Sequence, residues 1–452
     1  MNSWRLVRYF LMAFVGVVQA SATAFAAPVP VSAVASIEEM QAQSGSGMHV
    51  VQVLSYHQGQ NKGGGLFVWI PTVASAPDNC VTFAGNNTPA GRWVRQLAGA
   101  LDPTMCGAYW DGAHDDAAVL THAFAVASAL HVILSLPGGT AKVCSTVTTA
   151  RAVIVRGQGM GTPGDTAPSP TIIDGSCMKT GWVFDIITPN GTTNFEAPKY
   201  YDMEIRTAST GNPGGCIRWN SIAGGFTDTP ASQFYMMHPH AERIWCSQQT
   251  RQQVGLQCSK CFDGDFSQNN ITAGSIGIAL EGSDVMCIGC AGPNRISYAT
   301  DSLIRLAAHG TFGNMDRIVG NELLYPTDSH ASYDSFIYDS ARSSTIESNH
   351  IEGIVSGVKS AIHVVGGFST AILNNDIDVL ANTASAAPHW LVAEGPFVNF
   401  RAFNNGCGGC VLGPALFSNK SPTYNNGGVP QIITHGGNAA NGDAGFPFNS
   451  DR

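Results

Sequence analysis

A cluster of ionisable residues in the second half of the chain has the side-chain types that acid–base chemistry needs. It consists of Glu322, His350, Glu352, Asp376 and Asp378. Only 12% of all residues are charged, so the density of charged residues in this cluster is well above that of the chain as a whole. Closely spaced carboxylates repel, which raises the pKa of one of them. One group then stays protonated as a general acid, while its neighbour acts as a base or nucleophile. We predict that these five residues are catalytic.

The same oxygens allow two other interpretations. Several carboxylates at this spacing could hold Ca²⁺, which prefers oxygen ligands. They could also form a solvated polar face that prevents edge association. No other cofactor and no metal ligand set is predicted.

An internal repeat positions the cluster. An Asn-x-apolar-x unit recurs about every 27 residues, beginning at Asn269, Asn294, Asn321, Asn349, Asn375 and Asn405. The segment 242–245 aligns one repeat earlier. If the apolar residue points inward, its two neighbours point outward. The cluster then shares one outer face with Arg295 and Trp245, which we predict to bind substrate.

This period predicts a β-solenoid. A repeat of strands and turns leaves no room for the crossover helix of a βαβ unit. Each repeat can instead form one coil that lies about 4.8 Å from the next. Stacked Asn side chains would then bond to the coils above and below. The Ala-rich segment 117–130 predicts a helix that caps the N-terminal end, with Asp115 or Asp116 at its N-cap.

A second outward column precedes each Asn unit. Arg305, Tyr338 and His363 fall on consecutive coils of this column. They could bind substrate, or supply the base and cation of an elimination reaction; ordinary surface packing is the alternative.

Two further groups of polar residues have no assigned role. Asp263 and Asp265 indicate either a turn or part of a cleft shared with the five predicted catalytic residues. His238 and His240 lie in a segment between coils that could wall a groove, although solvated histidines are the commoner case.

The N-terminus is typical of an export signal. Arg5 and Arg8 precede the apolar run 10–18, and the residues 24–26 resemble a cleavage site. We therefore predict a signal peptide over 1–26 and a secreted or periplasmic protein. All 12 cysteines follow it, which favours disulfides in an oxidising compartment. Three C-x-x-C pairs, at 258/261, 287/290 and 407/410, are assigned to disulfides rather than zinc, because no His stands at finger spacing.

The rest of the chain divides into two parts. We predict a small segment of strands over residues 27–100. We predict the solenoid, with an irregular C-terminal tail, over residues 101–452. The formal charge of −9 and the pI of about 5.8 exclude a general nucleic-acid binder. No apolar run beyond the N-terminus reaches the roughly 20 residues of a membrane span.

Three segments resemble a known family. They are Gly107–Ala118, with its Asp-Gly-Ala-His-Asp-Asp run, Leu136–Val143 and Val155–Gly159. Together with the repeat they resemble the pectate-lyase-like right-handed parallel β-helices, which include polygalacturonase-type hydrolases and phage tailspikes. The strands at 63–69 and 92–95 resemble the small segment ahead of some tailspike-like domains. The family's hydrolase motifs are absent as a set, so no catalytic residue is carried over.

The resemblance implies an all-β fold, a right-handed parallel β-helix with an N-terminal capping helix, and leaves a homotrimer open. We predict a secreted enzyme that cleaves a polysaccharide backbone, with hydrolysis by paired carboxylates favoured. A polysaccharide lyase that acts by β-elimination on a uronate polymer is the first alternative. A noncatalytic glycan-binding or adhesive β-helix is the second.

Overall fold

The computed structural model describes most of the chain. The described residues are 31–43, 49–86, 88–149, 152–161, 170–188, 195–207, 214–221, 235–248, 253–272, 274–297, 299–308, 313–325, 335–355, 360–381, 389–408, 415–417 and 431–433. The predicted signal peptide lies outside them.

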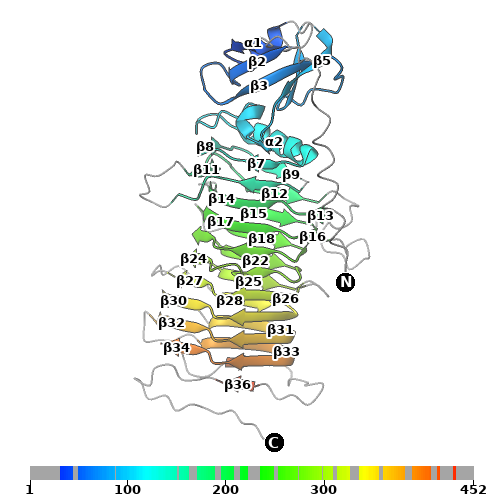
Figure 1. Cartoon of the computed structure of the whole chain (residues 1–452). Coiled ribbons are helices and arrows are strands. Elements are labelled where there is room, and N and C mark those ends of the chain that lie inside the picture. Colours follow the sequence, from blue (N-terminus) through cyan, green and yellow to red (C-terminus); the bar gives the residue numbers. More distant parts are fainter. Residues whose placement is uncertain are drawn as a thin grey trace, which may run out of the picture.

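A small sheet of five strands lies at one end of the molecule (Figure 1). In spatial order its strands are β1 (Val31–Val34), β2 (Val50–Ser55), β3 (Gly63–Ile70), β5 (Thr88–Arg95) and β4 (Thr82–Gly85), with α1 (Ile37–Ala42) beside them. Its own core contains Phe67, Phe83 and the edge-to-face pair Trp69 and Trp93. It therefore buries apolar surface independently of the rest of the chain.

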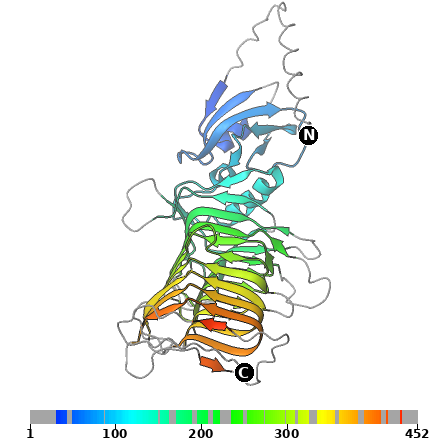
Figure 2. The same cartoon turned by 60° about the horizontal axis from the view of Figure 1, so that its bottom comes forward.

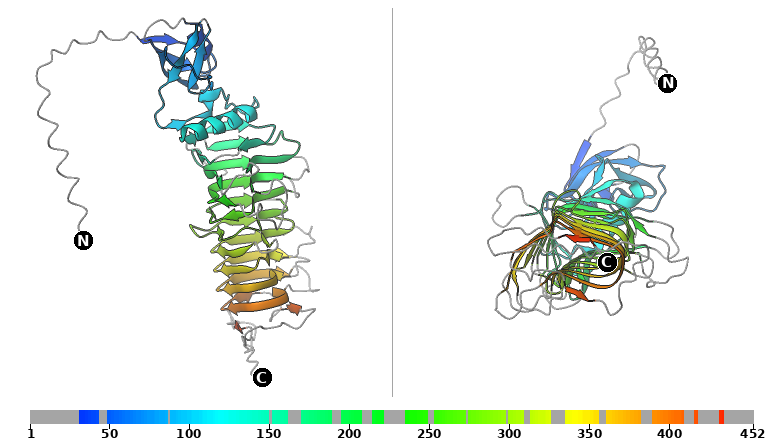
Figure 3. Two further views of the ribbon diagram at one scale, coloured as in Figure 1. Left: turned by 90° about the vertical axis from the view of Figure 1, so that its right-hand side faces the viewer. Right: turned by 90° about the horizontal axis from the view of Figure 1, so that it is seen from below.

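The second sheet has 28 strands and winds as a right-handed parallel β-helix. Figures 1 and 3 show its coils stacked as successive rungs, and Figure 2 shows the stack turned toward its C-terminal end. The all-β, parallel β-helix prediction is confirmed. Within the described part of the chain, no helix is long and apolar enough to cross a membrane.

The strands of this sheet form three faces, each a set of equivalent strands on successive coils. The first face contains β6 (Ala100–Leu101), β7 (Ile133–Ser135), β10 (Ile154–Arg156), the first half of β14 (Lys199–Arg206), the first half of β17 (His240–Ser247), β20 (Asp265–Ser267), β23 (Cys287–Ile288), β26 (Asn314–Val319) and β29 (Ser343–Glu347).

The second face contains β8 (Gly139–Lys142), β11 (Thr171–Asp174), the second halves of β14 and β17, β21 (Asn270–Thr272), β24 (Arg295–Ser297), β27 (Glu322–Tyr325), β30 (His350–Val355), β32 (Asp376–Ala381) and β34 (Gly406–Gly408).

The third face contains β9 (Val147–Thr149), β12 (Gly181–Ile187), β15 (Gly214–Asn220), β18 (Gln253–Ser259), β22 (Ile276–Glu281), β25 (Ser302–Ala307) and β28 (Ser335–Ser340). Two long strands, β31 (Ser360–Leu373) and β33 (His389–Phe403), run from the third face onto the first, and β35 (Ala415–Phe417) and β36 (Gln431–Ile433) pair with β33.

A separate three-stranded sheet joins β13 (Phe195–Glu196), β16 (Met236–Met237) and β19 (Cys261–Phe262). Its strands come from neighbouring coils and pair in parallel.

Stacked asparagines hold the corner between the first and second faces. The Asn321 amide donates to the carbonyl of Ile288 and to Asn349 Oδ1 at 2.9 Å each. Its own Oδ1 accepts from the backbone and side chain of Asn294. The same pattern runs from Asn269 to Asn405, all buried, so these buried polar groups are satisfied. The predicted Asn ladder is confirmed.

The alignment proposed for 242–245 is wrong by two residues. Trp245, not Arg243, pairs with Asn270, and the Ile244 N–H donates to Asn269 Oδ1. Strand β17 crosses this corner without an Asn, so the sequence offers no marker of the register there. Trp245 therefore lies in the outward column of Asn270 and Arg295, where the predicted alignment of 242–245 would place Arg243.

Helix α2 (Ala117–Leu130) covers the N-terminal coils (Figure 3). Its own side chains Leu120 and Phe124 are fully buried, and the ring of Phe124 lies 5.9 Å from that of Phe184. Asp116 is the N-cap residue but its carboxylate accepts from Tyr109 and Trp110 instead. The Asp115 carboxylate accepts the N–H of Ala117.

Disulfides tie the chain together at five described places. They are Cys80–Cys106, Cys144–Cys177, Cys216–Cys246, Cys258–Cys261 and Cys287–Cys290. The assignment of the first two C-x-x-C pairs to disulfides is confirmed. Cys407 is also disulfide-bonded, while residue 410 lies outside the described residues.

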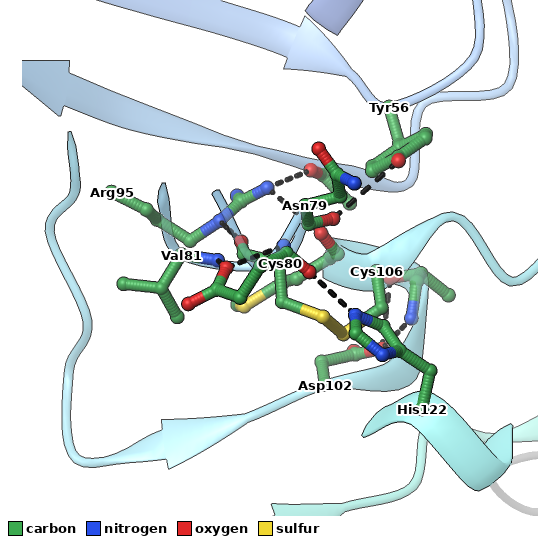
Figure 4. The surroundings of a disulfide bond; sticks show 12 residues. Tyr56, Asn79, Cys80, Val81, Arg95, Asp102, Cys106 and His122 are labelled. Carbon is green, nitrogen blue, oxygen red and sulfur yellow. Dashed lines mark hydrogen bonds between the residues drawn. A yellow bond between two sulfur atoms is a disulfide. The ribbon is translucent and has the colours of Figure 1, made fainter. Parts of the chain in front are cut away.

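The first disulfide joins the small sheet to the β-helix (Figure 4). Cys106 ends the short 3-10 helix η1 (Pro103–Cys106), and Cys80 lies two residues before the start of β4. Arg95 reinforces the junction, because its guanidinium donates to the carbonyls of Cys80 and Met105.

Candidate functional site

The structure brings the five predicted catalytic residues together on the second face. Glu322, His350 and Asp376 occupy one position on consecutive coils, and Glu352 lies beside Asp378. The imidazole of His350 lies 3.3 Å from Asp376 Oδ2 and 3.4 Å from Glu352 Oε2. We call these five residues the acidic ladder; their catalytic role stays a prediction.

The surroundings of the acidic ladder are open to solvent. The side chains of His350, Glu352 and Asp376 are 44%, 57% and 78% exposed. Water at this exposure screens the repulsion between carboxylates. Arg295 stays nearby, with its Nε 3.8 Å from Glu322 Oε2. Among the described residues, no group of three or more His, Cys, Asp or Glu side chains is arranged to hold a metal ion.

The second predicted column also forms as expected, on the third face. Arg305, Tyr338 and His363 are register partners on consecutive coils. The Arg305 guanidinium lies 5.6 Å from the Tyr338 ring centroid, and the His363 ring meets Tyr338 edge-on at 5.3 Å. The His363 side chain is only 7% exposed, with Nε2 3.4 Å from Glu394 Oε1. These side chains contact one another, and their role in substrate binding stays a prediction.

A hollow of about 560 Å³ lies on the first face. Its floor is a column of register partners from consecutive coils: Lys199, His240, Asp265, Cys287 and Arg317. We call this hollow the polar groove. The sequence predicted no site in this column; His240 and Asp265 stood in two separate groups of polar residues without an assigned role.

Two residues at the centre of the polar groove have opposite pKa shifts. Burial raises the pKa of the Asp265 carboxyl, although a hydrogen bond from Ser267 and the proximity of His240 oppose the rise. Burial lowers the pKa of His240, and the charge of Asp265 partly opposes that fall. The carboxyl is therefore held toward its neutral acid form and the imidazole toward its neutral base form. This is the protonation that acid–base catalysis needs.

Neighbouring side chains orient the His240 imidazole. Its Nε2 lies 3.2 Å from Glu242 Oε2. The Tyr201 ring lies 4.9 Å from the imidazole on the preceding coil. Contacts on two sides restrict the rotamers of the side chain and so fix the direction of its free nitrogen.

A polar clamp walls the polar groove. The imidazole of His238 has Nδ1 2.8 Å from Glu196 Oε2 and Nε2 3.6 Å from Asp263 Oδ2. The clamp connects residues of three coils beside the sheet formed by β13, β16 and β19. His238 and Asp263 thereby form a wall next to the column that contains His240 and Asp265.

The sequence contained the signal for the polar groove, but the alignment missed it. His238 lines the polar groove, but His240 belongs to strand β17 rather than to a segment between coils. Asp263 and Asp265 line this hollow on the first face, not a cleft shared with the acidic ladder. The two-residue error around β17 kept His240 and Asp265 from being read as one column. The structure supplies this register, because Trp245 pairs with Asn270 and His240 with Asp265, each 25 residues apart.

Comparison with known proteins supports the fold. Residues 33–98 match the phage tail protein small four-stranded beta-sheet domain. This range includes the two strands whose sequence resembles a segment ahead of tailspike-like domains. A search of curated proteins finds no match.

Solved structures of the same fold come from phages and bacteria. Tailspike protein 2 of the Escherichia coli O157:H7 bacteriophage CAB120 superposes with a TM-score of 0.60 at 13% identity, over 83% of this chain and 47% of its own. Tailspike gp49 of the Acinetobacter baumannii bacteriophage Fri1 is described as a capsular polysaccharide depolymerase. It superposes with a TM-score of 0.56 at 11% identity, over 87% of this chain and 76% of its own. The Azotobacter vinelandii mannuronan C-5 epimerase AlgE6 A-module superposes with a TM-score of 0.50 at 14% identity, over 74% of this chain and 92% of its own.

These likenesses define the class of protein as a parallel β-helix similar to phage tailspikes. The chain spans about half the length of the first tailspike. The narrower resemblance to pectate-lyase-like proteins stays a prediction.

Proposed function

We propose that this protein is an enzyme that cleaves a polysaccharide backbone, and that the polar groove is its active site. One observation carries the proposal: His240 and Asp265 lie side by side on consecutive coils, inside a hollow, with oppositely shifted pKa values. The description of gp49 as a polysaccharide depolymerase supports the choice of substrate.

The groove suits hydrolysis by a general acid and a general base. Protonated Asp265 donates its proton to the glycosidic oxygen as the C–O bond breaks. Neutral His240 accepts a proton from the attacking water, and the developing imidazolium is stabilised by Glu242 at 3.2 Å. The water's oxygen ends on the anomeric carbon, so the bond is cleaved without a cofactor.

The acidic ladder is the second candidate for the catalytic site. Its favouring observation is the register that pairs Glu352 with Asp378, since adjacent carboxylates suit the short separation of a retaining glycosidase. It lies on a different face from the polar groove, so variants separate the two sites. Ca²⁺ at the ladder and a solvated polar face are the other two alternatives for these oxygens.

A glycan panel tests the reaction. New reducing ends without absorbance at about 235 nm indicate hydrolysis, whereas absorbance there indicates the unsaturated ends of β-elimination. Retention of a glycan with neither signal favours a binding module. Asp265→Asn should abolish turnover with the fold intact, as judged by circular dichroism. Full activity of this variant, with loss in Glu352→Gln, would move the site to the acidic ladder.

The proposal also includes export and assembly. Secretion or a periplasmic location rests on the predicted signal peptide at 1–26. A homotrimer rests on the tailspike resemblance. Mass measurement of the exported protein by light scattering tests the second point, and N-terminal sequencing tests the first.

A further inference from the structure

A second hollow, of about 270 Å³, lies at the N-terminal end of the polar groove. Its lining comes from the end of α2 and the first coils, and is mainly apolar, with Val132, Ile133, Val153 and Ile154 among its residues. Ile133 and Ile154 are 38% and 42% exposed. These two side chains give the hollow an exposed apolar wall.

The two hollows adjoin at Lys199. Ile154 pairs with Lys199, and Lys199 pairs with His240, so the three residues stand in one outward column. Lys199 and its partner Glu196, 3.3 Å away, mark the boundary, because Lys199 lines both hollows. At the spacing of β-strands, Ile154 lies two coils, or about 10 Å, from His240.

This geometry limits what the second hollow can hold. A partner helix is about 10 Å wide and would not enter a space of 270 Å³. A ligand that also lies in the polar groove reaches the hollow directly, passing the Lys199–Glu196 pair. That pair offers an ammonium and a carboxylate to hydroxyl groups. Beyond it, His131 is the one other polar side chain among the described lining residues, and the remaining contacts are apolar.

We infer that the second hollow is an apolar subsite of the polar groove, and that it takes an apolar substituent of the glycan. The substituent is a short acyl ester or a methyl group, carried by a sugar near the cleaved bond. The inference rests on the proposed function and adds a specificity: glycans that carry the substituent bind and react better than those that lack it. One added methyl or methylene in such a pocket typically changes discrimination by about 10-fold or more.

The test compares one glycan in two forms. An O-acetylated capsular polysaccharide is used before and after mild alkaline removal of its esters. Wild-type protein should give a kcat/KM about 10-fold higher on the acetylated form. In Ile154→Thr and Ile133→Thr this preference should fall to about 2-fold or less. Threonine keeps the β-branched shape that the strands favour, and Leu54→Thr, in the small sheet and 60% exposed, should leave the preference unchanged.

Binding separates this inference from the proposed function. Calorimetry with Asp265→Asn measures affinity for both forms without turnover. Equal affinity and equal kcat/KM for the two forms would overturn the subsite while leaving the enzyme intact. No cleavage of either form, with binding that still prefers the acetylated one, would overturn the proposed function instead. A change of oligomeric mass in Ile154→Thr with unchanged preference would assign the apolar surface to contact between subunits.

Discussion

His240 and Asp265 occupy equivalent positions on consecutive coils of the β-helix, 25 residues apart in the sequence but paired in register. The β-helix imposes this proximity, because each coil repeats the outward direction of the one before. Burial in the same hollow then shifts their pKa values in opposite directions. Because equivalent positions on consecutive coils lie side by side, an acidic and a basic residue at one such position become neighbours.

Asp265→Asn should reduce kcat by about 100-fold to 10,000-fold, the range that a general acid contributes. The amide keeps the size of the carboxyl and can still accept from Ser267, but it has no proton to donate to the leaving oxygen. Rates are measured from reducing ends at saturating glycan. The matched control is Asp376→Asn, an exposed carboxylate of the acidic ladder; a larger loss in the control than in Asp265→Asn would contradict the assignment.

The pH dependence of kcat/KM should have two limbs. Activity requires Asp265 to be protonated and His240 to be neutral. It therefore falls as pH rises past the raised pKa of the carboxyl, and as pH drops below the lowered pKa of the imidazole. The optimum should be acidic, because the pKa of Asp265 rises from 3.8 and that of His240 falls from 6.5. His240→Gln should abolish the limb that belongs to the imidazole. A single optimum above pH 7 would be inconsistent with these roles.

The fold could be predicted from the sequence because its repeat is marked by a polar residue that must be buried. A buried Asn is costly unless every bond is made, and a stack of coils is an arrangement that lets Asn321 bond to Asn294 and Asn349 at once. The regular spacing of such residues therefore specifies both the coil and its register. Where the marker is missing, as in β17, the register could not be predicted.

The polar groove was harder to predict for a different reason. The column of His240 and Asp265 contains no repeated residue type, and its depth depends on the wall that His238 builds between Glu196 and Asp263. Residue types along a strand do not reveal which face is flat and which is hollow. The acidic ladder differs from the rest of the sequence in its density of charged residues. In the structure, however, its side chains are exposed, whereas His240 and Asp265 are partly buried.

Asn321→Ala should lower the free energy of unfolding by roughly 3 kcal/mol. The change removes the side-chain acceptor for the Asn294 N–H, and it leaves the carbonyl of Ile288 without its amide donor, each buried orphan costing about 1–3 kcal/mol. Chemical denaturation followed by tryptophan fluorescence measures the loss. Gln257→Ala, at an outward and half-buried position, should change stability by no more than about 0.5 kcal/mol; equal effects of both substitutions would argue that the ladder is not a stabilising network.

Stability should also fall as pH rises, because of one buried carboxyl. Burial raises the pKa of Asp339 to about 6, against the hydrogen bonds that Ser344 and Ala341 donate to it. The native state keeps a proton that the unfolded state releases from about pH 3.8 upward, so this residue's contribution is most favourable below that pH and declines until pH passes about 6. The full decline corresponds to about 3 kcal/mol. Asp339→Asn has no proton to lose, and its amide oxygen can still accept from Ala341. Its stability relative to wild type should therefore improve by most of that amount between pH 4 and pH 8, as measured by denaturation at both. A difference that does not vary with pH would show that Asp339 ionises at its ordinary pKa.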